Sequence, residues 1–135
     1  MKKLIFALVC FVASFAFVSC GSKEATPTGA AENSIELMKA KDYQGFIETI
    51  HFTGETPEEI EQQKEFYLGM IQGKADKTIT KRGGIESYTL ISEEIAEDGN
   101  TAKLQYELTY GDGTKDKSKF NMIKVDGKWM NEIKK

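Results

Sequence analysis

The side chains that could do chemistry in this chain are few, and its one histidine is the first to consider. His51 lies in the stretch TIHFTG, directly after an apolar segment. A Ser-His-Asp or Cys-His arrangement needs a nucleophile within reach of the imidazole, but no motif such as G-x-S-x-G is present. A zinc site usually draws on several histidines or cysteines. We therefore predict that His51 ends a helix, where a cation stabilises the last carbonyls, and we expect no catalytic, cofactor or metal site.

Two further features could serve a ligand or a partner. Trp129 follows the turn VDGK, where an indole could line a ligand mouth or fill the core. The stretch KADKTITKR could meet an anionic lipid or a partner, or could be a solvated loop. We interpret Trp129 as a core residue. We interpret the stretch as a charged surface loop that presents Lys74, Lys77, Lys81 and Arg82.

The amino-terminal residues are typical of a secretory leader. Lys2 and Lys3 precede an apolar run of fifteen residues from Leu4 to Val18. A helix of that length spans about 22 Å, less than the ~30 Å hydrocarbon core of a bilayer. Residues 1–19 are therefore predicted to be a cleaved signal peptide and not a transmembrane anchor.

The leader ends in FVSCGS, which resembles the lipobox of bacterial lipoproteins. The resemblance implies that Cys20 receives a diacylglyceryl group, becomes the first mature residue and is then acylated on its amino terminus. Because Cys10 would leave with the leader, the mature chain would hold no free thiol. By resemblance to lipoproteins of bacteria with two membranes, Gly21 favours transfer to the outer membrane. The periplasmic and the cell-surface face both stay open.

The charge of the chain excludes one class of partner. Removal of Lys2 and Lys3 leaves 16 basic against 21 acidic residues, a net charge of −5. Nucleic-acid binders show a basic patch and a high pI, so we expect no nucleic-acid partner. Attachment to a membrane would depend on acyl chains, in which each buried CH₂ contributes roughly 0.8 kcal/mol. Residues 20–26 would form a lipidated tether and residues 27–135 a single domain.

Helical signals fill the first half of that domain. Thr26 and Pro27 predict an N-cap and a first helical residue. Asp42 can cap a short second helix over YQGFIETI. The capping box TPEE at 56–59 starts a third helix, which we expect to end at Gly73.

The second half has the pattern of four strands. TAKLQYELTY alternates cleanly, IESYTLISEEI is apolar on both parities, and KFNMIKV changes parity between Met122 and Ile123, which predicts a bulge or a two-sided strand there. KWMNEI ends the chain. The turns EDGN, GDG and VDGK tolerate the positive φ of tight hairpins. Helices followed by a four-stranded antiparallel meander predict an α+β fold with the helices on one face of the sheet.

This order of elements, with AKDYQGFIETI and the closing MIKVDGKWMNEIKK, resembles small Bacteroidetes lipoproteins of unknown function in the nuclear-transport-factor-2-like, cystatin-like group. The resemblance covers residues 26–135 and implies a cone-shaped domain. Some enzymes of this fold, the ketosteroid isomerases and related cyclases, pair a carboxylate base with a tyrosine donor in the cone. The candidate tyrosines are Tyr67, Tyr106 and Tyr110, and the candidate acids are Glu86, Glu93, Glu94, Glu107, Asp98, Asp112 and Asp126.

These acids fall mostly on polar, edge or turn positions, and buried tyrosines commonly fill a core with their hydroxyls at its rim. We therefore favour a non-enzymatic, membrane-anchored lipoprotein whose domain binds a small ligand or a protein partner. The alternatives are an isomerase- or cyclase-type enzyme and a cystatin-like inhibitor or immunity protein. The oligomeric state, the ligand and the filling of the cone stay open.

Overall fold

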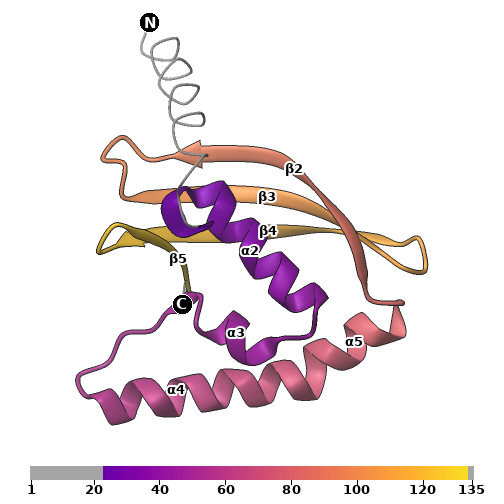
Figure 1. The fold of residues 1–135 in the computed structure, drawn as a ribbon, viewed down its shortest axis with the longest axis horizontal. Coiled ribbons are helices and arrows are strands. Elements are labelled where there is room, and N and C mark those ends of the chain that lie inside the picture. Colours follow the sequence, from indigo (N-terminus) through magenta and orange to yellow (C-terminus); the bar gives the residue numbers. More distant parts are fainter. Residues whose placement is uncertain (1–22, 134–135) are drawn as a thin grey trace, which may run out of the picture.

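A computed structural model of the chain describes residues 23–133, so the predicted leader and Cys20 lie outside the described residues. Helices come first and strands follow (Figure 1), which confirms the α+β class. The helical elements are η1 (Lys23–Ala25), α2 (Pro27–Lys39), α3 (Tyr43–Ile47), α4 (Pro57–Met70), η2 (Ile71–Ala75) and α5 (Asp76–Lys81). The strands are β1 (Ile50–His51), β2 (Ile85–Ile95), β3 (Thr101–Tyr110), β4 (Lys115–Val125) and β5 (Lys128–Glu132).

The sheet has five strands in the order β1-β5-β4-β3-β2. The four predicted strands form the antiparallel meander, but β1 joins its edge in parallel, pairing Ile50 with Asn131 and His51 with Glu132. The prediction of four strands was therefore one short, because a two-residue strand shows no periodicity. The prediction that His51 ends a helix was also wrong, since α3 ends at Ile47 and His51 pairs in a strand.

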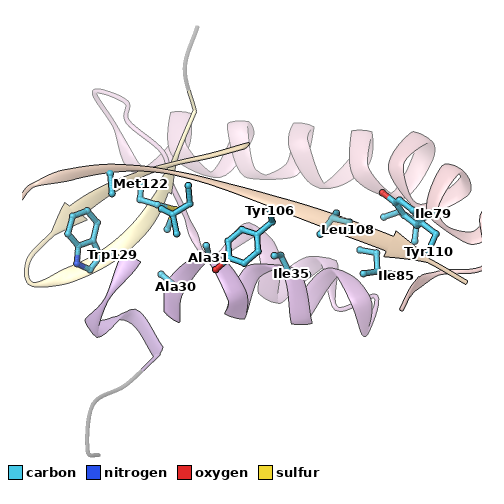
Figure 2. Close-up of a cluster of buried hydrophobic side chains, with 12 residues drawn as sticks. Ala30, Ala31, Ile35, Ile79, Ile85, Tyr106, Leu108, Tyr110, Met122 and Trp129 are labelled. Carbon is cyan, nitrogen blue, oxygen red and sulfur yellow. The ribbon is translucent and has the colours of Figure 1, made fainter. Parts of the chain in front are cut away.

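Helix α2 covers one face of the sheet, and the main core lies between them (Figures 1 and 2). Thr26 Oγ1 accepts a 3.0 Å hydrogen bond from the backbone N–H of Gly29, as expected of the N-cap. The inward residues of β3 alternate as predicted. The buried cluster consists of Ala30, Ala31, Ile35, Ile79, Ile85, Ala102, Leu104, Tyr106, Leu108, Tyr110, Met122 and Trp129.

A second, smaller cluster lies between α3, α4 and β1. Ile47, Ile50 and Phe52 are buried there, and Tyr67 packs on Phe52 with ring centroids 5.6 Å apart. Thr56 caps α4 by accepting from the Glu59 N–H. The Glu59 carboxylate accepts from the N–H of Glu55, one residue further back than the predicted capping box requires.

The third helix is longer than predicted. It does not end at Gly73 but passes through η2, a π-helical segment, into α5. The chain turns only at Gly83 and Gly84, which both have positive φ. The stretch that holds Lys74, Lys77 and Lys81 is thus helical, and the prediction of a loop there was wrong.

Of the two alternatives predicted for β4, the structure has the two-sided strand and not the bulge, since Met122 is buried and Ile123 is half-buried on the other face. β3 and β4 pair without a register shift, so Met122 and Ile123 are in regular register. The pairing of β2 with β3 shifts between Ile85 and Ser87 and again between Leu90 and Ser92. These shifts explain why the apolar residues of β2 fall on both parities.

Candidate ligand cavity

A cavity of about 480 Å³ opens between the carboxyl-terminal half of α2, the η2–α5 segment and strands β2 to β4. This volume lies within the range of small-molecule sites. Its lining is mostly apolar and comes from elements that are far apart in sequence. The lining residues are Ser34, Ile35, Met38, Phe46, Lys74, Ala75, Thr78, Ile79, Ile85, Leu108, Tyr110, Ser118 and Phe120.

The polar groups of the cavity are hydroxyls and one ammonium group. Ser34 is fully buried, donates to the Ala30 carbonyl at 3.1 Å and accepts from Asn131 Nδ2 at 2.7 Å. Burial raises the pKa of the Tyr110 hydroxyl. Lys74 is the only charged residue in the lining, and no Asp or Glu of residues 23–133 takes part in it.

Lys74 and Ala75 belong to the π-helical segment η2 and enter the cavity lining from it. A π-helical segment adds a residue to a helical turn and is frequent at functional sites. Lys77 and Lys81, on α5, do not line the cavity. Arg82 lies over the Tyr110 ring at 3.9 Å from the centroid and donates to Thr114 of the β3–β4 turn and to Asp116 of β4, so Asp116 pairs its charge.

Tyrosines do pair with carboxylates in this fold, but the acids come from helices. Tyr106 donates to Glu32 at 2.9 Å and Tyr88 donates to Glu36 at 2.8 Å. Both acids lie on α2. The third pair joins Tyr43 to Asp76 at 2.5 Å. These three acids are not among the candidates predicted from the sequence. The i, i+4 spacing of Glu32 and Glu36, which places both on one face of a helix, was the one signal that could have indicated them.

The tyrosine hydroxyls of the three pairs all have raised pKa values. Burial, and then the hydrogen bond to Glu36 or Asp76, raises the pKa of Tyr88 and of Tyr43 to about 12 each. Burial and Glu32 also raise the pKa of Tyr106. None of the six residues lines the cavity. The geometry therefore does not place a tyrosine–acid pair where a bound molecule would lie.

The other candidate acids either contact neighbouring protein groups or lie exposed on the surface. Glu93 accepts from the Thr28 hydroxyl, Glu107 lies 3.8 Å from Lys115, and Asp98 and Asp112 accept the N–H groups of Asn100 and Thr114 in their own turns. Glu86, Glu94 and Asp126 are exposed.

Trp129 is 5% exposed and packs in the main core, which confirms its interpretation as a core residue. Residues 23–133 contain no group of three or more acids, histidines and cysteines that could hold a metal ion. Over the same range, no helix has the length and hydropathy needed to cross a bilayer.

Comparison with known proteins supports the fold. No curated protein matches the chain. A Campylobacter jejuni structure described as that of a candidate NTF2-like transpeptidase superposes with a TM-score of 0.70 at 16% identity, covering 81% of this chain and 99% of that one. A SEC-C motif containing protein from Rhodopseudomonas palustris gives 0.52 at 13% identity, covering 82% and 77%.

At these identities the likeness is one of fold alone, and the fold is nuclear-transport-factor-2-like. Residues 18–131 match the family described as a domain of unknown function, DUF4878, and the chain therefore belongs to that family.

Proposed function

We propose that this chain is a lipoprotein of the outer membrane, anchored through acyl chains on Cys20, whose domain binds a small amphipathic molecule in the cavity. The observation that carries the binding role is the lining itself. Its long aliphatic and aromatic walls suit an apolar body, and Lys74 suits an anionic group at the rim. The anchoring role is supported by the leader and by the lipobox that ends at Cys20.

The proposal is non-catalytic because the lining offers no acid to act beside a tyrosine. An isomerase of this fold type would need a carboxylate within hydrogen-bonding reach of a ligand carbonyl. Glu32, Glu36 and Asp76 instead accept the tyrosine hydroxyls outside the cavity. Their contacts join helix to sheet and helix to helix, which is a stabilising role.

The anchor is tested by labelling cells with radioactive palmitate. The wild-type chain is expected to carry the label in the outer-membrane fraction, and Cys20→Ala is expected to carry none. Label that persists in the Cys20→Ala chain, or a wild-type chain without label, would contradict the anchoring.

The cavity is tested with 1-anilinonaphthalene-8-sulfonate, an amphipathic anion, on the chain from residue 20 with Cys20→Ala, which keeps both hydrophobic clusters. Lys74→Ala is expected to weaken binding about 2- to 5-fold, the effect of losing one exposed ion pair. Lys77→Ala removes the same charge three residues away, outside the lining, and is its matched control.

A second variant fills the cavity itself. Ser118→Phe adds a ring from β4 and is expected to abolish saturable fluorescence enhancement, whereas Thr109→Phe, on the opposite face of the sheet, is expected to leave it unchanged. Equal effects of Lys74→Ala and Lys77→Ala, together with unchanged binding in Ser118→Phe, would refute the binding site. Native mass spectrometry of the protein from its host then gives the mass of the natural ligand.

A further inference from the structure

The first described residues lie at one defined end of the sheet. Lys23–Ala25 packs against α2 and β5, and Glu24 shares a surface hollow with Val125, Asp126 and Lys128 at the β4–β5 turn. The β2–β3 turn closes the same end, since the N–H of Lys124 donates to the Asn100 carbonyl at 2.8 Å. The β3–β4 turn and α5 lie at the other end (Figure 1).

Chain length sets how far Cys20 can lie from this end. Only Gly21 and Ser22 separate Cys20 from Lys23, because residues 23–26, which were expected to belong to a tether, form η1 and the N-cap of α2. An extended chain advances at most ~3.6 Å per residue, so the Cα atoms of Cys20 and Lys23 are within about 11 Å of each other.

We infer that this end of the domain, formed by η1, the β2–β3 turn and the β4–β5 turn, rests on phospholipid headgroups. The inference depends on the proposed lipidation of Cys20 and adds the surface that meets the bilayer. With only Gly21 and Ser22 between the lipidated Cys20 and η1, the domain has too little tether to stand away from the membrane. This surface carries both positive and negative side chains, so its charge alone would not hold it on the bilayer, and the acyl chains do so. Its charged residues are Lys23, Lys124, Lys128, Glu24, Glu97, Asp98 and Asp126.

The orientation places the cavity away from the bilayer. Along β3, Leu108 and Tyr110 in the cavity lining lie six and eight residues beyond Ala102, which is near the membrane end. At ~3.3 Å per residue this separation is about 20–26 Å. A ligand would then exchange with the aqueous phase or a partner protein and not directly with the lipid under the domain.

The test uses the lipidated protein, produced with its leader, in phosphatidylcholine vesicles that contain lipids spin-labelled at the headgroup. Two exposed lysines begin adjacent strands at opposite ends of the sheet, Lys128 on β5 and Lys115 on β4. Lys128→Cys and Lys115→Cys each carry one fluorophore, because Cys20 is acylated and Cys10 leaves with the leader. The two sites are separated by about 33 Å along β4.

The expected result is contact quenching of the label at position 128 and none at position 115. Equal quenching at both sites, or stronger quenching at 115, would overturn the orientation. Palmitate incorporation is measured in the same samples. Its absence would overturn the anchoring and this surface together, whereas palmitate with equal quenching would overturn the orientation alone and leave the proposed function standing.

Discussion

The hydroxyl of Tyr106 donates a hydrogen bond of 2.9 Å to Glu32 Oε2, which joins the middle of the sheet to the helix that covers it. Tyr106 has no exposed surface, and its ring packs edge-on against Tyr88 and Phe120 with centroids 5.9 and 5.8 Å away. The three rings form a row across β2, β3 and β4 beneath α2. The hydrogen bond from Tyr106 to Glu32 holds α2 in place over this row.

Tyr106→Phe removes this hydrogen bond and keeps the ring. We expect the free energy of unfolding to fall by about 1–2 kcal/mol, since the acceptor is charged. A double-mutant cycle with Glu32→Ala, measured by urea unfolding, should show most of this as coupling energy. Tyr88→Phe is the matched control on the more exposed Glu36 pair and should cost less. Additive effects of Tyr106→Phe and Glu32→Ala would contradict the assignment.

The pairs that fix α2 show what the sequence could and could not predict. The caps at Thr26 and Asp42, the alternation of β3 and the three Asp-Gly turns are local signals, and each appears where it was predicted. The partners Glu32 and Glu36 depend on how α2 lies across the sheet. Nothing in the local pattern of α2 encodes that placement.

The errors have the same origin. A two-residue strand such as β1 exists only because β5 offers it an edge. Gly73 normally favours a helix end, but the helix continues through η2 because Ile79 of α5 is buried in the main core. The cavity could not be foreseen, because its walls come from seven separate elements.

Alkaline pH should destabilise the fold through its tyrosines. The pKa of Tyr43 and of Tyr88 is about 12 in the folded chain against 10.0 for an ordinary tyrosine. Because the folded pKa is raised, the stabilisation is fully present below pH 10 and is lost as the pH rises towards 12. Urea midpoints should therefore fall across this window, with tyrosinate absorbance rising as the chain unfolds. In the double variant Tyr43→Phe/Tyr88→Phe the urea midpoint should change less between pH 10 and 12. A double variant whose midpoint falls as steeply as that of the wild type would contradict the role of these two tyrosines.

A close backbone approach makes one glycine of the β3–β4 turn necessary. A Cβ on Gly111 would lie 2.4 Å from the Gly83 carbonyl oxygen, and the Gly111 N–H donates to the Gly84 carbonyl at 2.9 Å. Gly111→Ala should therefore lower the melting temperature. Gly69→Ala is the control, because a Cβ there meets no atom within 4 Å.

Since Gly69 lies inside α4, alanine there should stabilise the fold by about 0.5–1 kcal/mol. Thermal unfolding by circular dichroism measures both variants. A melting temperature that rises for Gly111→Ala would show that the turn does not need the close approach.

The Asn131 amide joins three segments through partly buried hydrogen bonds. Its Nδ2 donates to Ser34 Oγ at 2.7 Å and to Thr49 Oγ1 at 2.9 Å. Both hydroxyls already donate to carbonyls, those of Ala30 and Phe46. Asn131→Asp would set a carboxylate against two oxygens that have no proton left to give. We expect a loss of about 2–3 kcal/mol in the free energy of unfolding, measured in urea at neutral pH.

Asn121→Asp makes the same chemical change on the opposite face of the sheet, where Asn121 pairs with the exposed Lys103. It should change stability by less than about 0.5 kcal/mol. Lowering the pH should restore part of the loss in Asn131→Asp alone, because a protonated aspartate regains one donor. Equal losses in the two variants, without recovery in acid, would show that the Asn131 contacts do not stabilise the fold.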